Sequence, residues 1–121
     1  MAVVRLNNYL RTKRKHSALS QGDVSFLVRL KDKSDLSRYE RSLRQPSLRT
    51  ALAYQELYGV SVSDLFAGLS DSVAKDTRNR MKRLRTRLQA TIDPKSTGNR
   101  IMQKFLWISH RLLAKPNFQL V

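Results

Sequence analysis

Ser37-Arg38-Tyr39-Glu40-Arg41 stands about one short helix downstream of Leu19-Ser20-Gln21 and just before Arg44-Gln45-Pro46-Ser47-Leu48. Two short helices joined by a turn, the second rich in hydrogen-bonding side chains and followed by basic residues, make the arrangement that docks into the major groove of DNA. This stretch therefore predicts a DNA-reading helix, and the segments on either side of it are expected to build the rest of a small helical domain.

The segment before it predicts the first helix of the pair, called helix two here. Ser20 can cap this helix through its hydroxyl, and Asp23 three residues on completes a capping-box-like pattern that favours the positive helix start. Val24, Leu27 and Val28 then recur at helical spacing and are expected to face inward.

The next helix, helix three, follows a polar break between Arg29 and Ser34. Either Asp32 or Ser34 is expected to cap it, and Leu36 and Tyr39 point to one side at helical spacing. The residues left free to face outward are Lys33, Ser34, Ser37, Arg38 and Arg41. These side chains can meet base edges and phosphates, so helix three is the expected reading helix.

The flanking segments extend this all-α pattern. Helix one is expected to end near Ser17, and Pro46 fixes the chain before helix four, which ends at Gly59. Ser61-Val62-Ser63-Asp64 starts a short fifth helix that Ala67-Gly68-Leu69 terminates. The residues expected to face inward are Val3, Leu6 and Leu10 in helix one, and Leu48, Ala51, Leu52 and Leu57 in helix four.

The stretch from Leu19 to Leu65 resembles the helix-turn-helix domain of the lambda-repressor-like, or xenobiotic-response-element (XRE), family of bacterial and phage regulators. The similarity is carried by Leu19-Ser20-Gln21, Leu36-Ser37-Arg38-Tyr39-Glu40-Arg41, Pro46-Ser47-Leu48 and Gly59-Val60-Ser61-Val62-Ser63-Asp64-Leu65-Phe66. With helix one it covers residues 1–69 and implies a five-helix, lambda-repressor-like domain. The link between helices two and three lacks the family's usual glycine and is about one residue longer than the commonest pattern.

The resemblance implies which residues read bases. Lys33 and Ser34 match the positions that begin the recognition helix in family members, and Ser37 and Arg38 match the next outward turn. These four residues are the expected base-reading set. Arg38 suits guanine because its guanidinium can donate to two acceptors in the major groove, and such a pair contributes about 1 to 3 kcal/mol of discrimination.

Other residues near these helices are expected to position the domain. Arg14 and Glu40 match a family ion pair between helix one and the end of helix three, which makes Glu40 structural, whereas Asp35 is assigned to favouring the helix start. Phosphate contacts, which fix orientation without reading sequence, are expected from Gln21, Arg41, Arg44 and Gln45. Such contacts predict a strong dependence of binding on salt.

Residues 70–121 have a different character and predict a basic extension of two helices. A stripe at near-heptad spacing is formed by Val73, Thr77, Met81, Leu84 and Leu88. The basic run from Arg78 to Arg87 has three open interpretations: a solvated face, a phosphate-binding surface or a contact for an acidic partner. After a break at residues 93–98 come Ile101, Met102, Phe105, Leu106, Ile108, Leu112 and Leu113. This apolar helix is expected to pack on the first tail helix, on the DNA-binding domain or, preferably, across a homodimer.

Composition favours a polyanionic partner and excludes several kinds of site. The net charge is +15 and the isoelectric point is near 11.2. The chain lacks cysteine, and its two histidines, His16 and His110, have no metal-ligand pattern around them, so no metal, cofactor or catalytic residues are expected. The N-terminus lacks the long apolar run of a signal peptide or membrane span, so no membrane contact and a cytoplasmic, nucleoid-associated location are expected.

The pattern as a whole predicts a sequence-specific regulator of transcription that binds double-stranded DNA with helix three in the major groove. Repression by occupying an operator is favoured over activation. An antitoxin that autoregulates through the same domain while its tail covers a toxin is the first alternative. A protein that binds nucleic acid nonspecifically through charge is the second.

Overall fold

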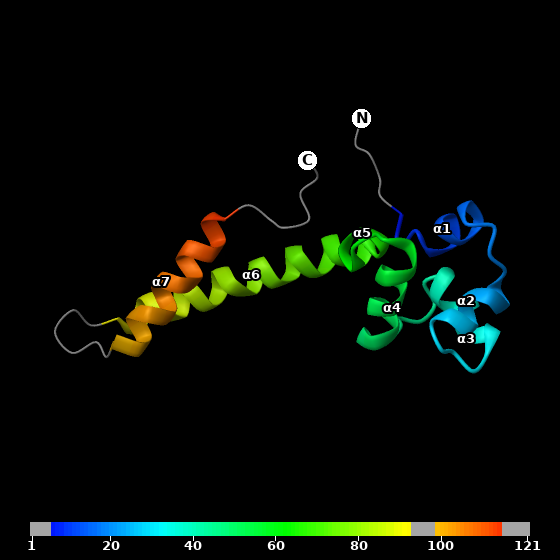
Figure 1. Ribbon diagram of the computed structural model, residues 1–121. Coiled ribbons are helices and arrows are strands. Elements are labelled where there is room, and N and C mark those ends of the chain that lie inside the picture. Colours follow the sequence, from blue (N-terminus) through cyan, green and yellow to red (C-terminus); the bar gives the residue numbers. More distant parts are fainter. Residues whose placement is uncertain (1–5, 93–98, 115–121) are drawn as a thin grey trace, which may run out of the picture. The chain divides into compact units, whose positions relative to one another are not determined.

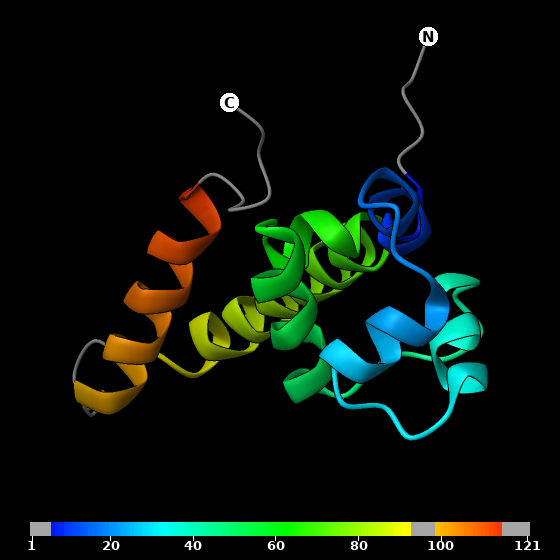
Figure 2. The same cartoon turned by 45° about the vertical axis from the view of Figure 1, so that its right-hand side comes forward.

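The computed structural model describes residues 6–92 and 99–114, and these residues fold as helices and connecting turns without a strand. The helices are α1 (Leu10–His16), α2 (Gln21–Leu27), α3 (Lys33–Glu40), α4 (Leu48–Tyr58), α5 (Val62–Leu65), α6 (Ala67–Thr91) and α7 (Asn99–Leu113). The chain divides into two compact units, Met1–Ser70 and Asp71–Val121. In the first unit α1 to α5 gather into a small bundle, in which α2 and α3 follow each other closely (Figures 1 and 2).

Caps at the helix starts follow from the sequence. The Ser20 hydroxyl accepts from the Asp23 amide and the Asp23 carboxylate accepts from the Ser20 amide, which is the predicted capping box. Asp32, not Ser34, caps α3, because its carboxylate accepts from the Ser34 amide at 2.9 Å. These hydrogen bonds from backbone amides lower the pKa values of both Asp23 and Asp32. Each helix of the pair thus has a defined first turn.

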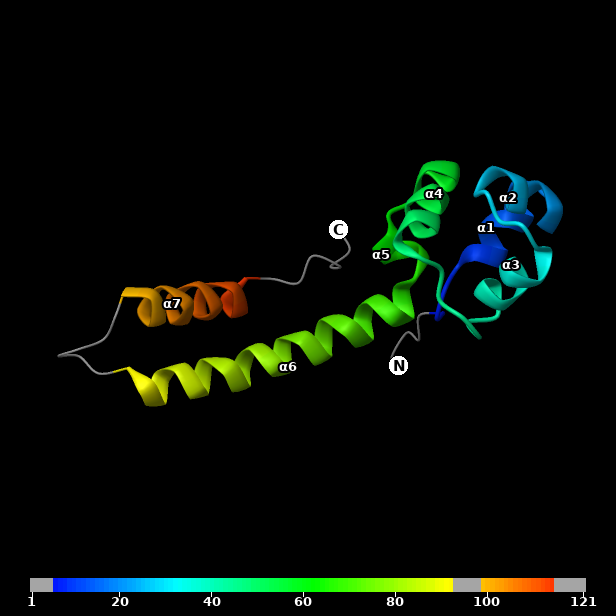
Figure 3. The ribbon, with the colours of Figure 1, turned by 90° about the horizontal axis from the view of Figure 1, so that it is seen from below.

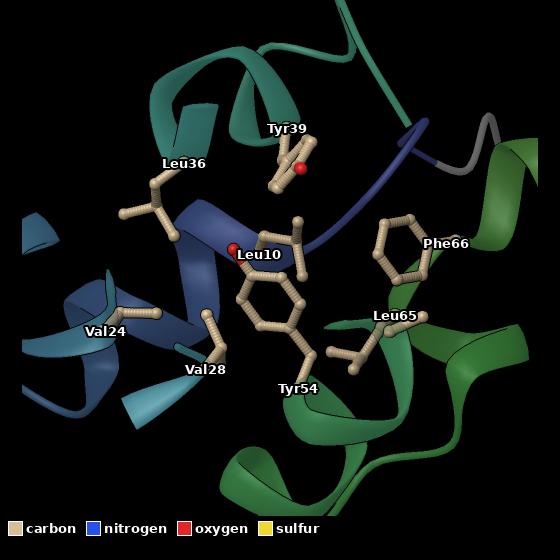
Figure 4. Close-up of a cluster of buried hydrophobic side chains, with 9 residues drawn as sticks. Leu10, Val24, Val28, Leu36, Tyr39, Tyr54, Leu65 and Phe66 are labelled. Carbon is tan, nitrogen blue, oxygen red and sulfur yellow. The ribbon is translucent and has the colours of Figure 1, made fainter. Parts of the chain in front are cut away.

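The core of the first unit is a cluster to which α1 to α5 all contribute, with Phe66 just after α5 (Figure 4). Tyr54 is its largest fully buried side chain, and its ring stacks on Tyr58 with 6.0 Å between centroids. Leu36 and Tyr39 face this core from α3, as predicted. The other members of the cluster are Leu10, Val24, Val28, Ala51, Leu65 and Phe66.

Helix one is shorter than predicted, because it begins at Leu10. Leu6 is exposed and not helical, and Val3 lies outside the described residues. The residues before α1 are held in place by hydrogen bonds instead: the Tyr9 amide donates to the Leu65 carbonyl at 2.8 Å, and the Asn8 side chain accepts from the Leu10 amide. The segment before α1 is therefore attached to the last residue of α5.

The predicted inward face of helix four is partly wrong. Ala51 is buried, but Leu48 is 73% exposed and Leu52 is also exposed, whereas Tyr54 takes the central buried position. Leu27 of α2, predicted to face inward, is exposed as well. These three leucines line an open groove of about 560 Å³ between α2 and α4. The ring of Tyr54 sets the rotation of α4 and turns Leu48 and Leu52 outward.

The predicted end of helix five is also wrong, since Ala67-Gly68-Leu69 forms the first turn of α6. α5 ends at Leu65, and Ala67 is fully buried. A Cβ added at Gly68 would lie 2.7 Å from the Asn7 Cα, so the lead-in to α1 passes directly over this glycine. Gly68 thus permits a close approach of backbones and is not a helix terminator.

In the second unit α7 lies alongside α6 (Figure 3), and the Arg78 guanidinium donates to the Leu112 carbonyl. Ile108 of α7 is buried, and Met81 and Leu88 of α6 are half-buried, as the apolar spacing predicts. The rest of the predicted α6 stripe, Val73, Thr77 and Leu84, is exposed. Ala74, Arg78 and Arg85 are half-buried in their place, so that the half-buried face of α6 follows spacings of four and three residues through Met81 and Leu88.

Candidate nucleic-acid interface

The outward face of α3 collects most of the predicted reading residues. Ser34, Ser37, Arg38 and Arg41 follow one another at spacings of three, one and three, which puts them on one side of a helix. Leu36 lies on the opposite side, in the core. Arg38 and Arg41 are exposed, and the two serines are half-buried. The face therefore offers hydroxyls at its base and guanidinium groups that extend beyond them.

Lys33 lies at the edge of this face, next to α2. A Cβ added at Gly22 would lie 3.1 Å from the Lys33 Cε, so the lysine stem crosses the first turn of α2. The Lys33 ammonium also contributes to the lowered pKa of Asp23, after the hydrogen bonds from Ser20. Lys33 remains exposed, at the point where the two helices of the pair meet.

An ion pair fixes the orientation of α3. The Arg14 Nε donates to Glu40 Oε2 at 2.7 Å and its Nη2 donates to Oε1 at 3.1 Å, with side chains only 13% and 4% exposed. This two-point contact raises the pKa of Arg14. The Gln21 amide donates to the same Glu40 at 3.3 Å. One carboxylate therefore ties the end of α3 to α1 and to the start of α2.

The predicted phosphate-binding residues lie at the start of α2 and in the segment after α3. Gln21, at the start of α2, has a second amide proton left beyond the one it gives to Glu40. Arg41 and Arg44 are exposed after the last turn of α3, as is Gln45. The structure thus gathers cations and amide donors near the C-terminal end of α3, where Gln21 contacts Glu40.

Asp35 has a role that the sequence interpretation missed. Its Oδ1 accepts from Arg38 at 3.2 Å and from Arg44 at 3.4 Å, so one carboxylate joins a predicted base reader to a predicted phosphate binder. The spacing of three residues between Asp35 and Arg38 was the available signal. The contact with Arg44 depends on the path of the chain after α3, which residue spacing does not give.

Asn8 is a second residue that the sequence interpretation missed. Its side-chain amide donates to the Tyr39 carbonyl at 2.9 Å and to the Ser42 hydroxyl at 2.8 Å, which caps the C-terminal end of α3. No local pattern marks this contact, because the two segments are more than thirty positions apart.

Other kinds of site are not found within the described residues. No group of three or more His, Cys, Asp or Glu in residues 6–92 and 99–114 is placed to hold a metal ion. Over the same residues no helix combines the length and the apolar character needed to cross a lipid bilayer. The residues gathered around α3 supply hydrogen-bond donors, acceptors and positive charge.

Comparison with known proteins assigns this arrangement to a family. Residues 10–65, from the start of α1 to the end of α5, match a family model described as helix-turn-helix. Neither the curated proteins nor the solved structures contain a match. The matched model confirms the resemblance drawn from the sequence and the all-α, helix-turn-helix fold. Residues 10–65 of this chain belong to the lambda-repressor-like, or xenobiotic-response-element, family of helix-turn-helix DNA-binding domains.

Proposed function

We propose that the protein is a sequence-specific, double-stranded DNA-binding transcriptional regulator that represses by occupying its operator. The observation that carries this proposal is the exposed face of α3, where Ser34, Ser37 and Arg38 project from a helix whose other side is fixed in the core. A rigid helix that presents such side chains is how the family's arrangement reads base edges. The protein then acts by binding in the cytoplasm, without catalysis or cofactor.

Base reading and phosphate binding are distinguished by which DNA a substitution affects. Arg38→Ala is expected to weaken the preferred duplex by about 1 to 3 kcal/mol while changing a scrambled duplex much less. Arg44→Ala is expected to weaken both duplexes similarly and to reduce the slope of log affinity against log salt by about one. Fluorescence anisotropy with both duplexes measures these quantities. Equal losses for Arg38→Ala on the two duplexes would refute the base-reading role.

The same proposal includes a homodimer formed through the second unit. Leu106 and Leu113 are exposed on α7, the latter at 84%, on the side of the helix away from the buried Ile108. A second copy can cover these side chains, and a dimer of this family would bind half-sites about one helical turn apart, roughly 34 Å between centres.

Light scattering on the full chain tests the dimer. The variant Leu106→Glu/Leu113→Glu is expected to have half the mass of the parent protein. The matched control is Leu43→Glu, another exposed leucine, which lies in the first unit and is expected to leave the mass unchanged. A parent protein that is already monomeric would exclude the dimer. An antitoxin role is favoured instead if the parent is monomeric and a small neighbouring gene product binds the same two leucines.

A further inference from the structure

The second unit is more basic than the DNA-binding unit. Residues 71–121 contain twelve Lys and Arg against three Asp, whereas residues 1–70 contain twelve against six acidic residues. Helix α6 holds seven of the basic residues of the second unit and two of its aspartates, Asp71 and Asp76. Most of the positive charge of α6 therefore has no carboxylate on the same helix to neutralise it.

This charge is arranged unfavourably for an isolated helix. Arg80 and Arg83 are three residues apart, and Arg83 and Arg87 are four apart, so these like charges face each other along the helix. Asp76 lies 3.4 Å from Arg80, but both side chains are more than 70% exposed, so water and salt screen the pair. A bound polyanion reduces this repulsion, because its negative charges neutralise the row formed by Arg80, Arg83 and Arg87.

The three arginines lie on the side of α6 that α7 does not cover. At 100° per residue Arg83 is almost opposite Met81, which is half-buried toward α7, and Arg80, Arg83 and Arg87 are all exposed. Arg78, by contrast, is half-buried and donates to the Leu112 carbonyl of α7. Arg78 therefore stabilises the second unit, whereas the three exposed arginines are available to a ligand.

The residues between these arginines favour phosphates over a protein partner. Leu84, four residues after Arg80 and three before Arg87, is the large apolar side chain between these arginines, and it is 41% exposed. Asn79, Thr86 and Ala90 lie on the other flank of Arg83. A stable protein interface needs a cluster of apolar or aromatic anchors, which one partly exposed leucine does not supply, whereas phosphate contacts need cations and hydrogen-bond donors. From Arg80 to Arg87 the helix rises roughly 10 Å. One DNA strand presents about three phosphates over that length.

We propose that Arg80, Arg83 and Arg87 form a second surface that binds the phosphate backbone of double-stranded DNA without reading its sequence. This inference rests on the proposed function for the identity of the ligand, and it assigns the three arginines to a site separate from α3. The surface adds affinity on any duplex and increases the salt dependence of binding. Specificity remains with the helix-turn-helix domain.

The test uses the full chain and an unrelated 30-base-pair duplex. Arg80→Gln/Arg83→Gln/Arg87→Gln is expected to weaken binding about tenfold or more at low salt, and to reduce the slope of log affinity against log salt by about two to three. The matched control, Lys75→Gln/Arg100→Gln/Lys104→Gln, removes the same charge from exposed positions elsewhere in the second unit. It is expected to weaken binding no more than about threefold. Equal losses in the two variants, or no loss in either, would overturn the proposal.

Further measurements distinguish this proposal from a loss of helix structure, from an acidic protein partner and from RNA binding. Circular dichroism should show unchanged or greater helix content in the triple variant, because glutamine is a good helix former and the repulsion is gone. Polyglutamate of matched charge should displace the duplex poorly; equal displacement would point to an acidic protein partner and contradict the assignment to DNA. Single-stranded RNA bound as tightly as duplex DNA through these arginines would contradict it too.

Failure of the further site and failure of the proposed function have different signatures. If only α3 reads sequence, the triple variant lowers affinity for preferred and scrambled duplexes by the same factor and leaves their ratio unchanged. If the chain has no preferred duplex, the triple variant still weakens binding to the unrelated one. The proposal of a second surface is refuted when the triple variant keeps the ratio of preferred to scrambled affinity and binds both duplexes as tightly as the parent chain.

Discussion

The Arg38 guanidinium lies 3.2 Å from the Asp35 carboxylate, one turn earlier on the exposed side of α3. Arg44 approaches the same oxygen at 3.4 Å. In the free protein the carboxylate thus restrains the arginine proposed to read a base, and it places a negative charge where DNA phosphates would approach. Restraint of Arg38 favours binding to the preferred sequence, because less side-chain freedom is lost when the arginine contacts a base. The negative charge of Asp35, in contrast, opposes binding to any DNA.

The first prediction follows from this balance. Asp35→Asn should strengthen binding to a scrambled duplex several-fold, because repulsion of phosphates is removed, and should lower the ratio of preferred to scrambled affinity. Parallel titrations of both duplexes measure the ratio. Glu56→Gln is the matched control, since Glu56 is an exposed carboxylate on α4. A ratio that Asp35→Asn leaves unchanged would show that the carboxylate does not prepare Arg38 for reading.

The second prediction concerns the ion pair that orients α3. Glu40→Leu should destabilise the domain by about 3 kcal/mol, the lower end of the range for a fully buried pair, because it leaves the half-buried Arg14 guanidinium without its partner. The double variant Arg14→Met/Glu40→Leu should recover much of that loss, since no charge is then left unpaired. Chemical unfolding followed by circular dichroism gives the free energies. Additive losses in the double variant would mean that the two residues act independently.

The third prediction concerns the turn between α2 and α3. Arg29 has a φ of 62°, a left-handed conformation that costs a residue with a side chain roughly 1 kcal/mol relative to glycine. Arg29→Gly should therefore stabilise the domain by up to about 1 kcal/mol. Gly59→Ala is the reciprocal control: φ is +64° there and nothing lies within 4 Å of an added Cβ, so only backbone strain opposes it. Destabilisation by Arg29→Gly would show that the arginine side chain stabilises this turn.

The fourth prediction concerns alkaline pH. Burial raises the pKa of Tyr58 to about 12 and raises that of Tyr54 further, and neither buried hydroxyl has a hydrogen-bond partner among the described residues. An unfolded tyrosine has a pKa near ~10. Between these values the folded state keeps protons that the unfolded state has lost, so stability is retained below pH ~10 and falls as the pH rises toward ~12.

Phenylalanine substitutions test this assignment. Tyr54→Phe/Tyr58→Phe should flatten the fall in stability above pH ~10 while changing stability little at neutral pH, because the hydroxyls removed are unpaired. Urea unfolding at pH 7, 9.5 and 11 gives the comparison, and Tyr9→Phe, outside the buried cluster, is the control. An unchanged pH dependence would assign the alkaline transition to other groups.

The sequence predicts much of the first unit because its signals are local. The capping box of Ser20 and Asp23, the buried pair Leu36 and Tyr39, and the turn at Gly59 each depend on residues a few positions apart, and the structure has all of them. The family resemblance also anticipated that Arg14 would lie beside Glu40, a contact that spacing alone does not give.

The errors arose where distant segments determine the outcome. Leu48 and Leu52 have the right spacing for a buried face, but the side of α4 that packs on the other helices is the one with Tyr54, and the two leucines are exposed. Gly68 has the composition of a helix end, yet the backbone at Asn7 passes over it and the helix continues. On α6 the half-buried positions include Arg78 and Arg85, because α7 covers a face that hydrophobicity does not single out.

The central claim, that α3 reads a specific sequence, is tested most directly by selection from a random duplex library. The selected sequence is then titrated with salt against its scrambled version. A palindromic winner bound about 10³-fold or more tightly than the scramble is the expected result, since a dimer that reads bases gains discrimination at both half-sites. Absence of an enriched motif, with equally steep salt dependence on every duplex, would contradict the claim and leave charge alone as the basis of binding.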